Sequence, residues 1–321
     1  MAVQPPLIEP ATLTAPPARR RRGGRARLTA VRFARNRLAL FGLCVIVLLF
    51  VLAYGSPLFY KWGYTELDFT AFQKPPSASH WFGTDQTGSD LFALTMRGMQ
   101  KSLVIGILTG LICTVVAAAI GASAGYFGGW TDRSLMWVVD LLLVMPSFLI
   151  IAVLSPLFQG TTWLVFVVLL AAFSWMITGR VVRSMTLTLK DREFVKAAKY
   201  MGVPAPVIIF RHILPSMASM LIIDGTIQVG AAIIGETSLS YFGFGVQPPD
   251  VSLGTVIATG TPAAPSFPWL FYFPAGCLVL VCLSIAFIGD GLRDALDPTS
   301  SRAKARAPRK SKNPSQEGRT S

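Results

Sequence analysis

Long apolar runs separated by short polar segments dominate the pattern of this chain. Leu38–Tyr60 and Ser102–Thr131 contain no charged residue, and three further stretches are nearly as apolar. About 20 consecutive apolar residues cross a bilayer as a helix. The pattern therefore predicts an all-α polytopic membrane protein with six transmembrane helices, near residues 38–58, 102–125, 134–154, 162–182, 213–236 and 268–289.

One polar passage, Asp191–Pro215, interrupts these runs with a different pattern. Phe194, Ala198 and Met201 follow the i, i+4, i+7 spacing of one apolar helix face, and three basic residues repeat that spacing on the opposite face. Gly202 and the two prolines after it end the helix. The passage predicts a short amphipathic helix that lies at the membrane surface and is held there by a partner.

Composition and charge support a membrane protein and give it an orientation. Hydrophobic residues make up 52% of the chain and charged residues only 14%. With six spans and a cytoplasmic N-terminus, 25 of the 29 lysines and arginines fall on the cytoplasmic side, which is the positive-inside pattern. The net charge of +13 is then mainly topological, and a nucleic-acid partner is not expected.

This topology divides the chain into five parts. The basic run Arg19–Arg22 precedes an apolar segment that is too long for a signal peptide, so we interpret that segment as an uncleaved first span. The expected parts are a disordered basic cytoplasmic tail at 1–37, the first transmembrane helix at 38–58, an extracytoplasmic loop at 59–101, a core at 102–292 that includes the surface helix near 191–202, and a basic cytoplasmic tail at 293–321.

Acidic residues inside the spans are the main candidates for function, because a carboxylate at mid-bilayer costs about 2.5–3.5 kcal/mol. Asp224 shares a polar and small stripe of its helix with Gln228, and this stripe either lines a pathway or contacts a partner subunit. Glu236 lies about 120° away near the outer end and is a candidate for assembly or gating. Asp140, close to the inner surface, is interpreted as the structural partner of a nearby arginine.

Other chemistry is not indicated. The four cysteines all fall within predicted spans, and the two histidines fall on opposite sides of the membrane, so no metal site is expected. The chain has no P-loop pattern and no metalloprotease motif. In the second span, small residues form a strip that should let helices approach closely: Gly106, Gly110, Cys113, Ala117 and Gly121.

The passage with the surface helix resembles the cytoplasmic signature of ABC importer permeases, E-A-A, three residues, Gly, nine residues, I-x-L-P. Ala197–Ala198, Gly202 and Leu214–Pro215 match it at the right spacing. Lys196 stands where the family has Glu, and His212 stands where it has Ile. The histidine is usual in the peptide branch of the family, whereas the lysine is a departure.

Four further segments resemble the dipeptide, oligopeptide and nickel branch of that family, in its order. They are His80–Asp90, Gly125–Asp132, Leu239–Pro249 and Gly289–Pro298. The likeness covers residues 33–298 and indicates the second permease subunit of a peptide-type importer.

The resemblance implies the type I ABC importer transmembrane fold, with a five-helix core and an added N-terminal helix, in a bacterial plasma membrane. It implies a sister permease, two ATPase subunits that bind ATP and Mg, and an extracytoplasmic binding protein, with no cofactor bound by this chain and no catalytic role for it. The surface helix becomes the coupling helix, whose contact residues would be Glu193, Lys196, Ala197, Ala198, Met201 and Gly202. Asp224, Gln228 and Glu236 would belong to the translocation pathway.

Several alternatives remain at this stage. The substrate could be a peptide, nickel or another small solute. The chain could instead be an ion-coupled transporter in which Asp224 carries a proton, although it has no inverted repeat. A third possibility is a membrane scaffold whose basic helix binds anionic lipid.

Overall fold

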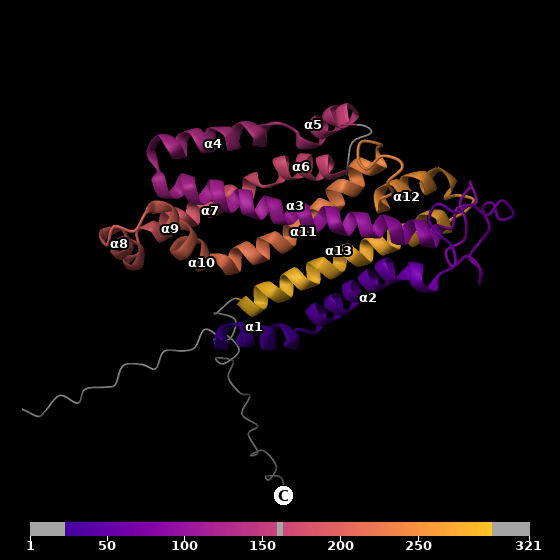
Figure 1. Ribbon diagram of the computed structural model, residues 1–321, viewed down its shortest axis with the longest axis horizontal. Coiled ribbons are helices and arrows are strands. Elements are labelled where there is room, and N and C mark those ends of the chain that lie inside the picture. Colours follow the sequence, from indigo (N-terminus) through magenta and orange to yellow (C-terminus); the bar gives the residue numbers. More distant parts are fainter. Residues whose placement is uncertain (1–22, 159–162, 297–321) are drawn as a thin grey trace, which may run out of the picture.

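A computed structural model describes residues 23–158 and 163–296, and these ranges are mostly helical. The long helices run side by side in an elongated bundle, with α8 at one end and α12 at the other (Figure 1). We call these the α8 end and the α12 end. The helices are α1 Gly23–Arg35, α2 Arg37–Phe59, α3 Leu91–Phe127, α4 Gly129–Val144, α5 Ser147–Leu154, η1 Ser155–Phe158, α6 Trp163–Ser174, α7 Met176–Lys190, α8 Glu193–Tyr200, α9 Ala205–Ile208, η2 Ile209–Ile213, α10 Leu214–Ser216, α11 Ala218–Tyr241, α12 Leu253–Gly260, η3 Thr261–Ala263 and α13 Trp269–Leu296.

The described helices include four unbroken candidate spans and two bent pairs, which bring the number to six when each pair is counted as one span. Helices α2, α3, α11 and α13 are each long and apolar enough to cross a membrane. The third span is α4 followed by α5 at an 80° bend, and the fourth is α6 followed by α7 at a 47° bend. Pro146 lies at the first break, where proline cannot donate a backbone hydrogen bond. Hydropathy detected both spans but could not detect the bends.

The second span is longer than predicted, and the loop before it is correspondingly shorter. Helix α3 begins at Leu91 instead of residue 102, so the loop expected at 59–101 ends at Asp90. At about 1.5 Å per residue, the 37 residues of α3 extend about 55 Å, well beyond a hydrocarbon core of about 30 Å. Hydropathy registers only the part of a helix that lies in lipid, so the pattern places the first turns, with Arg97 and Lys101, in the loop.

Two other boundaries also differ from the prediction. Helix α1 occupies much of the segment expected to be disordered, because Phe33 contacts Gly291 on α13 and Asn36 donates a 3.1 Å hydrogen bond to Asp294. The fifth span begins at Ala218 and not near residue 213, because the chain turns at Met217 after Pro215.

Helix α3 occupies the centre of the bundle and packs against both α7 and α11, while α13 packs between α2 and α11. The small residues of α3 make the first two contacts possible. A Cβ on Gly106 would collide with Ile233 of α11, and one on Gly121 would collide with the Gly179 carbonyl of α7. The predicted close approach along this strip is confirmed.

Ion pairs join α4 to α7 near the α8 end. Arg180 donates to Asp140, which confirms the expected arginine partner of that carboxylate. One turn farther along, Arg183 forms two hydrogen bonds with Asp132, with an Nη2–Oδ2 distance of 2.6 Å. A bidentate pair of this kind fixes orientation as well as distance, so α4 is attached to α7 at two levels.

Candidate functional site

Helix α8, at the tip of the bundle, ends through a glycine-dependent cap. Gly202 has φ +75°, a left-handed conformation that glycine adopts without steric cost. The Val203 N–H donates to the Ala198 carbonyl and the Gly202 N–H donates to the Lys199 carbonyl. These two bonds form a Schellman motif. The glycine of the signature is therefore explained locally, because it adopts the left-handed conformation that ends α8.

The face of α8 that the chain itself buries differs from the predicted one. Val195 and Ala198 are each only 2% exposed. They pack in a cluster whose other buried members are Ala122, Val182, Ile208, Ile209, Ile213 and Met217. Phe194 and Met201, expected on the same apolar face as Ala198, are 45% and 75% exposed. Periodicity identified apolar positions but could not tell which neighbour would cover each one.

The exposed surface of α8 combines apolar and charged side chains. Tyr200 is 89% exposed and lies beside Met201. Ala197 is exposed, as is Glu193, whose carboxylate in the first turn is favourable next to the helix N-terminus. The Lys196 Nζ lies 3.9 Å from the Asp191 carboxylate, a weak solvent-exposed pair.

A groove of about 830 Å³ borders α8. Helix α8 and the segment after it form one wall, and the ends of α3 and α7 form the other. The residues that line it include three lysines and two tyrosines: Tyr126, Lys190, Lys196, Lys199 and Tyr200. The groove is therefore basic and partly aromatic.

The structure brings the polar stripe of α11 against the break between α6 and α7. The Thr178 hydroxyl donates a 2.7 Å hydrogen bond to Asp224 Oδ2, and the Gln228 amide donates a 2.8 Å bond to the Ser174 carbonyl. Both stripe residues are half-buried. Within residues 23–158 and 163–296, no cation pairs with Asp224.

Glu236 does not share this surface, because its side chain is fully buried. Its carboxylate accepts a 2.9 Å hydrogen bond from the Ser102 hydroxyl of α3 and a 2.6 Å bond from the Ser240 hydroxyl of α11. Those hydroxyls in turn accept from the N–H groups of Leu253 and Val246. Glu236 therefore joins α3 and α11 to α12 and the loop before it, and in this conformation it lines no open surface.

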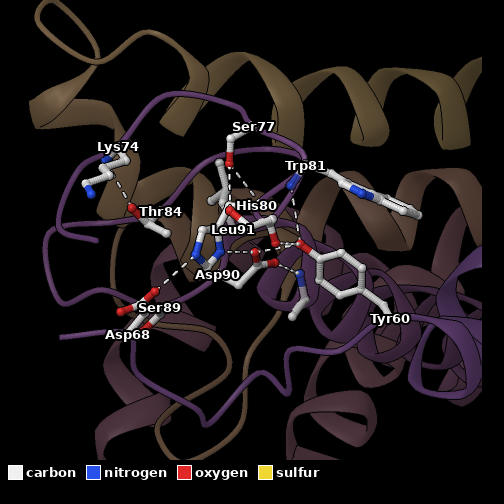
Figure 2. Close-up of polar contacts among 12 residues, drawn as sticks. Tyr60, Asp68, Lys74, Ser77, His80, Trp81, Thr84, Ser89, Asp90 and Leu91 are labelled. Carbon is white, nitrogen blue, oxygen red and sulfur yellow. Dashed lines mark hydrogen bonds and ion pairs between the residues drawn. The ribbon is translucent and has the colours of Figure 1, made fainter. Parts of the chain in front are cut away.

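A second polar cluster holds the segment between α2 and α3 at the α12 end (Figure 2). We call Tyr60, Asp68, His80 and Asp90 the polar lock. The Asp90 Oδ2 atom accepts a 2.7 Å hydrogen bond from the Tyr60 hydroxyl and lies 2.8 Å from His80 Nδ1, while Oδ1 accepts from the Ala93 N–H. The other ring nitrogen of His80 lies 3.4 Å from Asp68. Asp90 thus caps α3 and fixes the loop.

Two members of the lock have shifted pKa values. Burial, reinforced by the hydrogen bond to Asp90, raises the pKa of Tyr60 well above its ordinary value. Hydrogen bonds from the Thr70 hydroxyl and N–H lower the pKa of Asp68. Because the pKa of Tyr60 is raised in the folded chain, the stability gained from its protonated hydroxyl is fully present below about pH 10, the pKa of an unfolded tyrosine. It is lost only as the pH rises above that value.

We expect Tyr60→Phe to loosen the loop, because it removes the hydrogen bond to a buried carboxylate. Amide hydrogen exchange across residues 77–93 should accelerate by about tenfold, since such a bond is worth about 1.5 kcal/mol or more. The Tyr60 phenol itself does not titrate between about pH 6 and pH 9, so it contributes no pH dependence of its own to this effect. Tyr64→Phe, which removes a neighbouring hydroxyl outside the lock, is the control. Unchanged exchange in Tyr60→Phe would contradict the lock.

Several residues that the structure brings into these sites have no recognisable pattern in the sequence. Tyr60 gave no signal, because its partner Asp90 lies 30 residues away. Ser102, the partner of Glu236, lies 134 residues away and resembles any other small residue in a span. His80 and Asp90 did lie in a segment singled out by its resemblance, and that segment was the available signal.

Comparisons with known proteins agree with the architecture. Residues 117–302 match the family model described as "Binding-protein-dependent transport system inner membrane component". Residues 25–76 match the model of the N-terminal transmembrane domain of oligopeptide transport permease C.

Curated relatives extend the match over most of the chain. The oligopeptide transport system permease protein OppC of Mycobacterium tuberculosis is 54% identical over 277 residues, which are 86% of this chain and 95% of the relative. A putative peptide permease protein of Brucella suis is 39% identical over 84% of this chain and 90% of its own length. The protein named OppC in Bacillus subtilis is 35% identical, over 84% and 88% respectively.

Proposed function

Because the chain belongs to the family of binding-protein-dependent transport system inner membrane components, we propose that it is a permease subunit of an ATP-driven importer that moves peptides into the cytoplasm. Peptides are the proposed cargo because the names of the relatives from Mycobacterium, Brucella and Bacillus refer to oligopeptides or peptides. The α8 end faces the cytoplasm, in agreement with the distribution of lysine and arginine.

The observation that carries the proposal is the second, uncovered face of α8. Phe194, Tyr200 and Met201 are large, exposed and located at the tip of the bundle beside a basic groove. Exposed apolar residues rimmed by charge are typical of a protein interface. The partner is an ATPase subunit that receives α8 in a groove of its own.

The buried face of α8 explains how movement of the ATPase reaches the membrane. Val195 and Ala198 pack with Ala122 of α3 and Val182 of α7, so α8 cannot shift without pushing the ends of both helices. Because packed cores rearrange between discrete states rather than deforming continuously, closure of the ATPase dimer would move these spans as a rigid body. ATP binding favours one packed state over the other only if the contacts made in the two states differ in free energy.

The remaining partners follow from the same assignment. A sister permease would complete the pathway, and an extracytoplasmic binding protein would deliver the peptide at the α12 end. ATP and Mg would be bound by the ATPase subunits, with neither held by this chain. Asp224 and Gln228 would face the pathway near the break between α6 and α7, with Thr178 orienting the Asp224 carboxylate.

Co-purification and uptake test the whole proposal. We expect the chain to be recovered in a stable complex with ATPase subunits, and a strain that lacks its gene to lose uptake of labelled tri- to pentapeptides while retaining nickel uptake. If the strain lost nickel uptake alone, nickel would replace peptides as the proposed substrate. Active uptake by this chain without ATPases would refute the ATP-driven assignment and support ion coupling.

We expect Met201→Asp to uncouple α8 from the ATPase, because it places a carboxylate in the apolar contact while leaving the buried face intact. Peptide uptake should fall by about tenfold or more, which corresponds to loss of about 1.4 kcal/mol. The ATPases should also dissociate during purification. Met201→Leu keeps the apolar volume and should behave as the wild type. If Met201→Asp retains both its ATPases and its transport, α8 does not dock through this face.

We expect Asp224→Ala to lower peptide uptake by about tenfold, the effect of losing one charge-assisted contact, while the ATPases still co-purify. Thr178→Val removes the hydrogen bond but leaves the carboxylate, so its effect should be smaller. The measurement is initial uptake of a labelled tripeptide at matched membrane levels of the protein. Normal uptake by Asp224→Ala would exclude a pathway role.

A further inference from the structure

A cavity of about 360 Å³ lies between the end of α2 and the first turns of α3. Its walls include Ser56 and Pro57 of α2, Ala93 and Gln100 of α3, and part of the connecting segment near the polar lock. This volume is within the range of about 300–1,000 Å³ that is typical of sites for small ligands. It is separate from α8 and from the Asp224 stripe.

The depth of the cavity can be estimated from helix lengths. The 23 residues of α2 extend about 35 Å, enough to cross a hydrocarbon core of about 30 Å. The last turn of α2 therefore reaches the level of the lipid headgroups. Leu58 and Phe59, which lie between the cavity-lining residues Pro57 and Tyr60 in the sequence, are 91% and 54% exposed, as expected for side chains that face lipid.

Charged groups of both signs line the cavity without internal ion pairs. Lys61, Glu66 and Arg97 all contribute to it. In the part of the chain that the structure describes, none of these three residues forms a salt bridge. Lys61 and Glu66 lie on the loop, whereas Arg97 lies on α3, so the charges surround the space from two elements.

Arg97 is positioned to receive an anion. Its guanidinium lies 4.9 Å from the centre of the Tyr64 ring and donates a 3.0 Å hydrogen bond to the side chain of Gln100. Its Nε atom is buried and has no hydrogen-bond partner among the described residues. A guanidinium held in place by these contacts matches the geometry of a phosphate.

Aromatic rings complete the site. Tyr60, Trp62 and Tyr64 all line the cavity, and rings of this kind gather at the headgroup level of membranes. Trp62 also stacks on His80 of the polar lock, with a centroid distance of 4.8 Å. An occupant of the cavity would therefore contact the same ring that packs against the lock.

We propose that this cavity binds the headgroup of an amine-bearing phospholipid, of the phosphatidylethanolamine type. Arg97 and Lys61 bind the phosphate, and Glu66 accepts hydrogen bonds from the ammonium group. The acyl chains of the lipid extend out of the cavity along Leu58 and Phe59. The headgroup in the cavity belongs to a membrane lipid and not to a free zwitterion such as a peptide, because the cavity borders lipid-facing side chains at headgroup depth.

The test uses the purified complex with its ATPases, stripped of lipid in detergent and titrated with defined lipids. Native mass spectrometry measures the lipid that the complex retains. The wild type should bind phosphatidylethanolamine more tightly than phosphatidylcholine, whose methylated ammonium cannot donate hydrogen bonds. Arg97→Gln should weaken that binding by about tenfold. Glu66→Gln should abolish the preference between the two lipids. Lys74→Gln, which removes an exposed lysine of the same loop outside the cavity, should change nothing.

Two further variants distinguish loss of the binding site from a folding defect. Arg97→Lys retains the charge without the fork and should bind with intermediate affinity, and Lys61→Gln removes an exposed cation and should weaken binding about threefold. Wild-type affinity in both Arg97→Gln and Lys61→Gln would overturn the site. Displacement of the lipid by excess tripeptide would overturn the lipid assignment, and equal binding of all lipids by the wild type would overturn recognition of the amine.

Discussion

Ala198→Asp is expected to abolish peptide uptake while the chain still inserts into the membrane. Ala198 is 2% exposed and packs beneath α8 against helices of its own chain. A carboxylate there would be buried without a cation, which costs about 3 kcal/mol or more. Uptake should then fall by about a hundredfold. The α8 segment would separate from the α3 and α7 ends, so that ATPase movement would no longer be transmitted.

Two measurements identify the cause of that loss. Hydrogen exchange across residues 191–203 should accelerate strongly in Ala198→Asp, because the defect lies within this chain. Thr188→Asp introduces the same charge at an exposed position of α7 and should retain uptake and exchange near the wild type. If Ala198→Asp transports normally, or if its α8 remains protected from exchange, the assigned seating of the helix is wrong.

Glu236→Ala is expected to be the most destabilising substitution at the α12 end. It removes the acceptor of two buried hydroxyls, Ser102 and Ser240, and leaves a cavity between α3, α11 and α12. With about 1–3 kcal/mol for each unsatisfied group, the loss in free energy of unfolding should be about 3 kcal/mol. Transport should fall as well, because α12 would no longer be held against the spans.

Unfolding of the purified protein in mixed micelles measures this effect. Glu236→Gln keeps one acceptor and most of the side-chain volume, so its loss should be only about 1 kcal/mol. Ser238→Ala, on the same helix, removes a hydroxyl whose one hydrogen bond among the described residues is to the Ile234 carbonyl, and it should change the free energy of unfolding by less than about 0.5 kcal/mol. Equal stability of Glu236→Ala and the wild type would exclude a supporting role for the carboxylate.

The exposed Lys196 has a limited role in this structure. Its only ion pair in the described part of the chain is the 3.9 Å contact with Asp191, and it does not help to seat α8. Its presence at the position where the signature has Glu is thus compatible with the same helix, cap and packing. Any effect of this departure would arise in the contact with the ATPase.

The apolar helices and their approximate positions could be predicted from residue order. Apolar length and charge distribution are properties of consecutive residues, and the bilayer translates them directly into spanning helices. The strip of small residues on α3 and the arginine partner of Asp140 were predicted correctly for a related reason. Inside a bilayer, small side chains in a span typically mark close helix contacts, and acidic side chains need a polar or charged partner.

The faces and contacts of those helices required the folded chain. Periodicity grouped Ala198 with Phe194 and Met201, but packing against α3 and α7 buried Val195 and Ala198 and left the other two exposed. The sequence groups Glu236 with the pathway residues, whereas in the structure a hydrogen bond from Ser102, far away in the sequence, holds its carboxylate inside the bundle. Local sequence specifies which residues prefer burial, whereas the partner that buries each one depends on contacts between distant segments, and only tertiary packing brings those segments together.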